Sequence, residues 1–318
     1  MCIRDSWGET VNEDEARAWT LRHEHLIKAT YRDPKGELWW TNAKKPWQFL
    51  AWCLEAHLWI NDSLSESRLP ITVDATSNGL QVMSLMLKYK EGAEATNCAP
   101  VTDRRDIYQE VLDKVKEKMQ ETTLGWDWIS LNIDRSLIKS IVMAIPYGCT
   151  HYRAEELVLQ WYHQKQSNIF DGRVRKAVAH LGLSIVNVFY GLYPKFKDLM
   201  TYLGTTYSIL GSPLVWVSPS GFPVRQFYKK TTAKRTKSLL FGRMRSIQFR
   251  VDTDEVDDGK MARSFTPNLI HSLDASILHI ALAKTKVDSV AAVHDSFATH
   301  ANDLDDLIPV SYTHLRAH

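Results

Sequence analysis

Val293-His294-Asp295-Ser296-Phe297 (VHDSF) sets a carboxylate between two short runs that are typical of β-strands. A second carboxylate, Asp74, ends another strand-like run, Ile71-Thr72-Val73. Between the two carboxylates in sequence lies a helical segment with a basic and aromatic face: Arg135, Lys139 and Tyr147. Two carboxylates at strand ends, together with a basic helix, suit metal-assisted phosphoryl transfer, in which two divalent ions about 3.5–4 Å apart neutralise the attacking and leaving oxygens.

The two aspartates are the candidate metal ligands. Mg²⁺ prefers hard oxygen atoms and is often bound by only one or two carboxylates together with substrate phosphates, so Asp74 and Asp295 would suffice. Each aspartate taken singly is more often a turn former or a helix cap. Their combination with the basic helix makes a nucleotide polymerase the leading hypothesis.

The helical segment supplies candidate phosphate ligands. Arg135 and Lys139 are four residues apart and therefore share one helix face. Met143 and Tyr147 continue that stripe, with a drift of about 40° per step. Cations on this face suit an incoming triphosphate, and Tyr147 would then meet its sugar or base. Spacing alone favours the simpler alternative, an amphipathic helix whose Arg and Lys face water.

A strongly basic stretch runs from Arg225 to Arg250 and contains no acidic residue. A hairpin with this charge suits contact with phosphates, and Arg also reads guanine edges in a major groove. The alternative is a solvated positive loop, offset by the acidic residues between Asp252 and Asp258. Because the stretch holds no acid, nucleic-acid binding is the favoured interpretation. Its nine cations are Arg225, Lys229, Lys230, Lys234, Arg235, Lys237, Arg243, Arg245 and Arg250.

Length and composition indicate a globular protein with a substantial core. The 318 residues are 44% hydrophobic and 24% charged, which is ordinary for a soluble domain. The net charge of +2 means that any nucleic-acid footprint must be local. No run of about 18 apolar residues is present, so no membrane span is expected. The four cysteines are widely separated and are expected to be free thiols in a reducing cytoplasm.

The periodicity predicts an α+β fold that is mostly helical. Two strand runs around Ser218-Pro219-Ser220-Gly221 predict a hairpin, and another hairpin is expected around Asp295. Residues 252–258 are expected to form an acidic loop. Hydrophobic spacing predicts helices over 10–35, from Pro46 onward, 103–121, 130–146, 152–166, 172–203 and 261–285.

The two ends of the chain differ from the rest. Residues 1–6 (MCIRDS) and 310–318 (VSYTHLRAH) resemble translated sequencing-adaptor tails. The expected natural segment therefore runs from Trp7 to Pro309 and is a fragment cut at both ends.

Three ordered motifs resemble the single-subunit, bacteriophage-type DNA-dependent RNA polymerases, which share a right-hand palm and fingers with the family A DNA polymerases. Weaker similarity extends from Trp39 to Ala301. The motifs are Asp74-Ala75-Thr76-Ser77-Asn78-Gly79-Leu80-Gln81, Arg135-Ser136-Leu137-Ile138-Lys139 with Ile145-Pro146-Tyr147-Gly148, and His294-Asp295-Ser296-Phe297.

The resemblance implies a role for each motif residue. Asp74 and Asp295, with the backbone carbonyl of Ala75, would hold two Mg²⁺ ions. Arg135 and Lys139 would contact the nucleotide phosphates. Further positions are implied at the ribose and at promoter bases. They are Tyr147, Gly79 and His271 at the ribose, and Arg235, Lys237 and Arg245 at the bases.

Two positions separate the RNA polymerases from their DNA-polymerase relatives. Those relatives carry a bulky Glu where Gly79 stands, which blocks a 2′-hydroxyl, and a Glu where Ser296 stands. Both differences favour RNA synthesis. One departure is Ala75, which replaces the glycine usual after the first aspartate and disfavours positive φ.

The resemblance also implies a domain layout and partners. The palm, with a small antiparallel sheet, would comprise residues 7–102 and 272–309, and helical fingers would comprise residues 103–271 with a recognition hairpin at about 213–250. The partners would be double-stranded promoter and template DNA, the RNA transcript and ribonucleoside triphosphates. A monomer encoded by a phage is expected in the cytoplasm of a bacterial host.

Two alternatives stay open. One is a family A-like DNA polymerase, and the other is a catalytically dead DNA-binding remnant that keeps only the basic hairpin. An inactive fragment is also compatible with the motifs.

Overall fold

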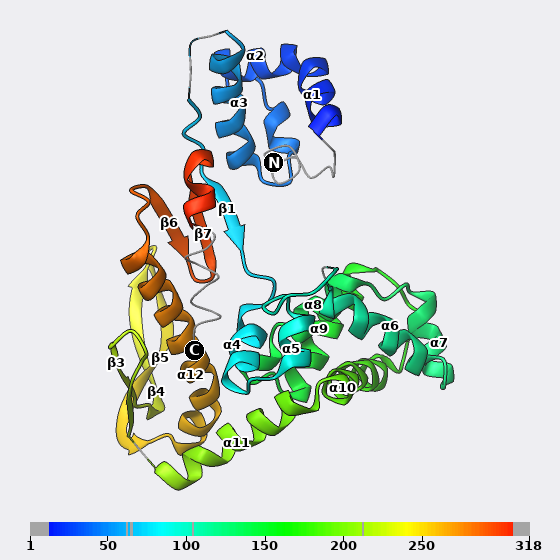
Figure 1. Ribbon diagram of the computed structural model, residues 1–318. Coiled ribbons are helices and arrows are strands. Elements are labelled where there is room, and N and C mark those ends of the chain that lie inside the picture. Colours follow the sequence, from blue (N-terminus) through cyan, green and yellow to red (C-terminus); the bar gives the residue numbers. More distant parts are fainter. Residues whose placement is uncertain (1–12, 62, 64–65, 104, 212, 308–318) are drawn as a thin grey trace. The chain divides into compact units, whose positions relative to one another are not determined.

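The strand that ends at Asp74 and the hairpin around Asp295 belong to one antiparallel sheet. The computed structural model describes residues 13–61, 63, 66–103, 105–211 and 213–307 (Figure 1). These fold as two compact units. Unit 1 holds the described residues up to Asp74 and those from Thr285 onward, and unit 2 holds Ala75–Lys284. The expected adaptor tails lie outside the described residues.

The sheet of unit 1 has the order β1-β7-β6. Its strands are β1 (Ile71–Asp74), β6 (Val290–Val293) and β7 (Ser296–Thr299), and a short 3-10 turn, η4 (Ala301–Asp303), follows. The central strand β7 buries Phe297 and Thr299 on one face, as expected for alternation along a half-covered strand. Both predicted strand positions are confirmed.

Unit 1 also contains a helical cluster with its own aromatic core. Its elements are α1 (Glu13–Arg22), α2 (Glu24–Arg32), η2 (Trp39–Asn42) and α3 (Pro46–Ile60). The single helix expected over 10–35 is interrupted at His23, which precedes α2 in a non-helical conformation. Trp19 of α1 and Ile27 of α2 are both buried in the core that α3 completes with Phe49. The predicted start of α3 at Pro46 is confirmed, since proline is well placed at the first helical position.

Unit 2 is built mainly from helices around one large hydrophobic core. The predicted period of four in residues 103–121 is confirmed, because Ile107, Val111, Val115 and Met119 are all buried. The helices are α4 (Asn78–Met86), α5 (Lys90–Ala95), α6 (Ile107–Met119), α7 (Thr123–Ser130), α8 (Arg135–Val142), α9 (His151–Gln164), α10 (Val174–Leu192), α11 (Pro194–Leu210) and α12 (Asp258–Lys284).

Two predicted helices are each divided into shorter elements near a proline, and the first also begins later than expected. The helix expected over 130–146 is α8 followed by the 3-10 turn η3 (Ile145–Tyr147), which contains Pro146. Tyr147 is therefore not on the regular helix that carries Arg135. The helix expected over 172–203 divides at Tyr193 into α10 and α11. Tyr193 has a non-helical backbone (φ −129°, ψ 66°), which the following proline favours, and Pro194 begins α11.

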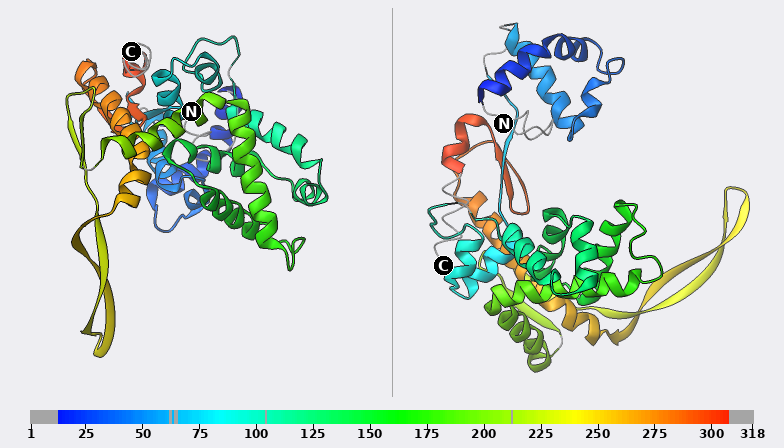
Figure 2. Two further views of the ribbon diagram at one scale, coloured as in Figure 1. Left: turned by 90° about the horizontal axis from the view of Figure 1, so that it is seen from below. Right: turned by 90° about the vertical axis from the view of Figure 1, so that its right-hand side faces the viewer.

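Two hairpins complete unit 2. The first pairs β2 (Leu214–Val217) with β3 (Pro223–Gln226), as predicted, and the second pairs β4 (Lys229–Leu240) with β5 (Arg243–Val256). The prediction of an acidic loop over 252–258 is wrong, because the first part of this segment belongs to β5 and pairs with β4. Lys230 there contacts Glu255 at 2.8 Å. Both views in Figure 2 show the β4–β5 hairpin projecting away from the helices of unit 2.

The unit boundaries differ from the predicted palm and fingers. Residues 75–102 and 272–284, assigned to the palm from the sequence, lie in unit 2, and the assignment of palm and fingers stays a prediction. The mostly helical α+β class is confirmed. Among the helices of the described residues, none alone combines the length and the apolar composition of a membrane span; the bent pair α10–α11 reaches both only when its two helices are taken together.

Candidate active site

The two predicted metal ligands lie at neighbouring strand ends of the unit 1 sheet. Asp74 is paired with Ser296 in the antiparallel register of β1 and β7, and Asp295 immediately precedes Ser296. Paired Cα atoms are about 4.5–5.5 Å apart and consecutive ones about 3.8 Å. The Cα atoms of the two aspartates are therefore separated by no more than about 9 Å. Folding brings the backbones of these two aspartates, which are far apart in the sequence, to the same end of the sheet.

The position of Asp295 depends on a tight turn. β6 ends at Val293 and β7 begins at Ser296, so only His294 and Asp295 connect them. His294 has a positive φ of 55°. Two-residue hairpin loops that match the strand twist require positive φ, and His is among the residues that tolerate this region. The turn fixes Asp295 at the end of the sheet where β1 places Asp74.

The carboxylates of Asp74 and Asp295 suit a hard cation that completes its coordination with oxygen atoms from water or substrate. Asp74 is exposed and Asp295 is half-buried. In the described parts of the chain, no three His, Cys, Asp or Glu side chains gather as a metal site. Two carboxylates without further acidic ligands fit Mg²⁺, which commonly takes one or two carboxylates together with water and substrate phosphates.

The predicted phosphate-binding cations lie on α8 in unit 2. Arg135 donates to Asp106 through Nε at 2.6 Å and through Nη2 at 3.1 Å. Asp106 is also the N-cap of α6 and accepts hydrogen bonds from the backbone of Tyr108 and Gln109. Burial acts to raise the pKa of Asp106, but the hydrogen bonds from Arg135 and the helix backbone outweigh it and hold that pKa below its usual value. Asp106 therefore stays ionised and orients Arg135.

One aromatic ring lies beneath both cations. The guanidinium carbon of Arg135 is 5.1 Å from the ring centre of Tyr108, and the ammonium nitrogen of Lys139 is 6.0 Å from the same centre. The Tyr108 hydroxyl donates to the carbonyl of Thr76 at 3.2 Å. Arg135 and Lys139 are themselves exposed, so their charged ends are accessible to an anion.

The start of α8 is fixed by Asp134. Its carboxylate accepts hydrogen bonds from the backbone N–H groups of Ser136 and Leu137, and it also contacts Lys165 at 3.2 Å. Burial raises the pKa of Asp134, but hydrogen bonds from the Ser136 hydroxyl, the Leu137 backbone and Lys165 outweigh it and leave the pKa below the usual value. An ionised cap at this end also matches the helix dipole, so Arg135 begins a well-defined helix.

The three predicted ribose-site residues also come together in unit 2. The rings of Tyr147 and His271 are stacked, with centres 4.7 Å apart. A Cβ atom added to Gly79 would lie 2.8 Å from Cβ of Pro146 and 3.1 Å from the Tyr147 hydroxyl. The absence of a side chain at Gly79 is therefore what allows α4 to approach η3 so closely.

Several partners of these residues were not predicted from the sequence. Asp106 and Tyr108 lie 27 or more positions from the α8 cations, and no local pattern connects them. Asn78 donates to the buried Asp274 on α12 at 2.6 Å. The only sequence signal was that Asn78 lies within the first motif, and Asp274 lies three positions beyond His271 on the same helix.

The basic hairpin brings the three predicted DNA-reading residues together but divides them between two faces. Arg235 is paired with Gln248, Lys237 with Ser246, and Ser238 with Arg245. Because side chains alternate along a strand and paired residues share a face, Arg235 and Lys237 lie on one face and Arg245 on the other. Arg235 donates to Gln248 at 3.2 Å, which agrees with this register.

Comparisons with known proteins place the chain among polymerases. The profile of the DNA-dependent RNA polymerase family matches residues 7–312. A probable DNA-directed RNA polymerase of Neurospora crassa is 30% identical over 295 residues, which cover 83% of this chain and 33% of that protein. The mitochondrial DNA-directed RNA polymerase 1 of Arabidopsis thaliana is 29% identical over 307 residues, 91% of this chain and 31% of that protein. The chain thus spans about a third of the length of these relatives.

The expected location in a bacterial cytoplasm is contradicted by these relatives, and the expected phage origin stays a prediction. They come from a fungus and from plants, and the names of the plant proteins assign them to mitochondria or chloroplasts; a chloroplastic/mitochondrial polymerase 2 of Nicotiana sylvestris is 29% identical over 291 residues, 86% of this chain and 28% of that protein. The motifs identify the chemistry of a family but carry no information on the compartment in which its members act. The family resemblance itself is confirmed: the chain belongs to the single-subunit, phage-type family of DNA-dependent RNA polymerases.

Proposed function

We propose that this chain forms the catalytic part of a DNA-directed RNA polymerase that joins ribonucleoside triphosphates on a DNA template by a two-metal mechanism. The observation that supports the proposal is the register that sets Asp74 opposite Ser296, because it brings the two aspartates to neighbouring strand ends. Membership of the family supports the same reaction. The activity is proposed for the protein of which this chain is part.

In this proposal Asp74 and Asp295, with the backbone carbonyl of Ala75, hold two Mg²⁺ ions. Such ions, when bound, neutralise charge at the attacking and leaving oxygens. The two carboxylates supply hard oxygen ligands, and the short His294–Asp295 turn limits the freedom of one of them. A rigid ligand pair is needed because misplacement by about 1 Å can slow such reactions roughly a hundredfold.

The residues of unit 2 would bind the nucleotide. Arg135 and Lys139 would offset the charge of the triphosphate, while the 3′-hydroxyl of the transcript attacks the α-phosphorus and pyrophosphate leaves. The Tyr147–His271 stack would lie at the ribose, and the absent side chain of Gly79 would leave room for a 2′-hydroxyl. The close approach of Gly79 to Tyr147 supports this part of the proposal.

The basic hairpin would bind promoter DNA. Its cations project from a ribbon whose strands, among the described residues, pair with each other, and a ribbon of two strands is of a size that enters a major groove. Arg235 and Lys237 share a face with Gln248, which adds a side chain able to donate and accept hydrogen bonds.

The decisive experiment is Asp295→Asn in the polymerase that contains this chain. Elongation on a primed template should fall by at least about a hundredfold, because a metal ligand contributes several kcal/mol of charge stabilisation. The affinity for promoter DNA should change less than about twofold, since the hairpin is unchanged. Asp288→Asn, an exposed aspartate of the same unit, is the matched control and should elongate normally. Normal elongation by Asp295→Asn would contradict the metal assignment.

A further inference from the structure

The ring of Tyr108 is almost completely buried, with 2% of its surface exposed, yet its face is covered by two charged groups. Arg135 and Lys139 both lie above it. They are four residues apart on α8, whereas Tyr108 belongs to α6. Two like charges so close together repel, and an aromatic face attracts each of them through its quadrupole. The ring thus offsets part of the cost of holding the two cations side by side.

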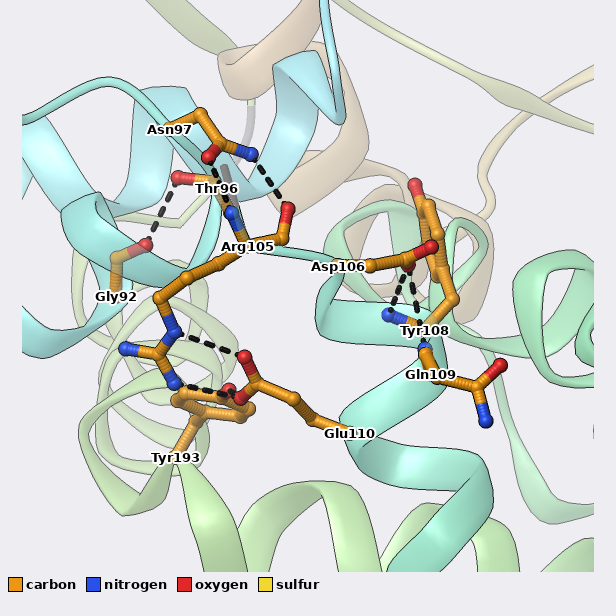
Figure 3. A network of polar contacts seen from close by, with 9 residues as sticks. All are labelled: Gly92, Thr96, Asn97, Arg105, Asp106, Tyr108, Gln109, Glu110 and Tyr193. Carbon is orange, nitrogen blue, oxygen red and sulfur yellow. Dashed lines mark hydrogen bonds and ion pairs between the residues drawn. The ribbon is translucent and has the colours of Figure 1, made fainter. Parts of the chain in front are cut away.

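Three contacts keep this ring in place. Its backbone N–H donates to Asp106 at 3.1 Å, its hydroxyl donates to the carbonyl of Thr76 at 3.2 Å, and the side chain is enclosed by the unit 2 core. Asp106, which anchors the backbone, also holds Arg135 through two nitrogens. Figure 3 shows Asp106 with its hydrogen bonds to the start of α6. The platform is therefore rigid although the cations are exposed.

The pairing with Asp106 leaves part of the Arg135 guanidinium available. Asp106 uses the edge formed by Nε and Nη2, so with respect to the described residues the N–H groups of Nη1 remain for another acceptor. Lys139 has no salt-bridge partner among the described residues, and its ammonium group carries three donors. The two cations thus present several donors toward solvent from one supported position.

We infer that Tyr108 is a positioning residue for polyphosphate: its ring holds Arg135 and Lys139 in the arrangement that grips the triphosphate of an incoming nucleotide. This inference rests on the proposed phosphate role of the two cations. It assigns the effect to the face of the ring and not to the hydroxyl, whose partner is the Thr76 backbone. Tyr108 itself does not touch the phosphates.

The test measures binding of inorganic tripolyphosphate to the 318-residue chain by calorimetry at low salt. Tyr108→Leu should weaken binding by roughly threefold to tenfold, the range expected when two cation–π contacts are lost. Tyr108→Phe keeps the ring and should restore affinity to within about twofold of the unchanged chain. Tyr207→Leu is the matched control, since Tyr207 is another buried tyrosine of unit 2 whose hydroxyl contacts Asp258 at 2.9 Å.

A second variant keeps the inference testable if Tyr108→Leu does not fold. Pentafluorophenylalanine at position 108 preserves ring size but reverses the charge distribution of its face, so it should weaken tripolyphosphate binding relative to Tyr108→Phe. Equal affinity of these two rings, with Arg135→Ala weakened, would overturn the inference and leave the proposed function standing. If Arg135→Ala and Lys139→Ala bind as tightly as the unchanged chain, the proposed phosphate role itself is wrong.

Discussion

Residue 79 is glycine because a methyl group there would collide with the first turn after α8. The added Cβ would lie 2.8 Å from Cβ of Pro146, a separation that a packed core does not accommodate without movement. The same glycine lies within α4, where alanine would normally be preferred by up to about 1 kcal/mol. Steric and conformational effects therefore oppose each other at this position.

Gly79→Ala should destabilise the protein, because overpacking costs about 1–3 kcal/mol and exceeds the gain in helix propensity. The measurement is urea unfolding followed by circular dichroism. Gly204→Ala is the control, since Gly204 lies within α11 and has no atom within 4 Å of an added Cβ; it should stabilise the protein. A stabilising Gly79→Ala would show that Pro146 and Tyr147 move aside freely, and the proposed ribose role of this glycine would lose its support.

The elements around α6 are joined by a polar network. Glu110 accepts hydrogen bonds from Arg105 at 2.8 and 2.6 Å and from the Tyr193 hydroxyl at 2.7 Å. Figure 3 shows Arg105, Glu110 and Tyr193 converging in this way. Arg105 also exchanges two hydrogen bonds with Asn97. The network connects the segment before α6 to the junction of α10 and α11.

The network predicts sensitivity to acid. Burial raises the pKa of Glu110, but the hydrogen bonds from Arg105 and Tyr193 outweigh it and hold the pKa below its usual value. The pKa of Asp106 and that of Asp134 are lowered in the same sense. A carboxyl whose pKa is lower in the folded state stabilises the fold above its unfolded pKa, near 4, and loses that contribution as the pH falls through the folded pKa. Stability should therefore fall below about pH 4.

Glu110→Gln tests this interpretation. At pH 7 it should cost about 1–2 kcal/mol, because charged hydrogen bonds are lost at a partly exposed site, and the cost should shrink at pH 3. Glu117→Gln removes an exposed ion pair from the same helix and should have little effect at either pH. Urea unfolding at the two pH values gives the loss of unfolding free energy for each variant. A cost for Glu110→Gln that does not change with pH would show that the carboxyl is not the group that titrates.

At the level of elements, the sequence predicted what depends on neighbouring residues. The strand ends at Asp74 and Asp295, the start of α3 at Pro46 and the buried stripe of α6 all follow from local patterns. The division at His23 of the helix expected over residues 10–35 does not follow from local patterns, because it depends on how α1 and α2 pack against α3. The contacts of Arg135 with Asp106 and Tyr108 were missed for the same reason: they join segments whose meeting is decided by the core.

On the scale of the whole molecule, the β4–β5 hairpin extends away from the rest of unit 2 beyond its base, where Val256 packs against the core. Its strands pair with each other along their length, and their side chains are mostly exposed. Fold and proposed DNA binding can therefore be separated.

Replacing residues 233–250 by an Asn-Gly turn, which joins the paired Thr232 and Val251, should leave the unfolding free energy of the chain within about 0.5 kcal/mol. Binding of duplex DNA at low salt should fall at least about tenfold, because six cations are removed. A full-length hairpin with those six cations changed to Gln is the control that separates charge from shape. Undiminished DNA retention by the shortened chain would contradict the proposed role of the hairpin.

The same ribbon raises a problem of solubility. A sheet of only two strands has two open edges, and each offers unpaired N–H and C=O groups to a strand from another copy. Lys and Arg side chains along both strands make such stacking unfavourable through mutual repulsion, which weakens as salt screens it. The charges that suit the hairpin to an anionic partner thus also keep copies of the protein apart until that partner covers them.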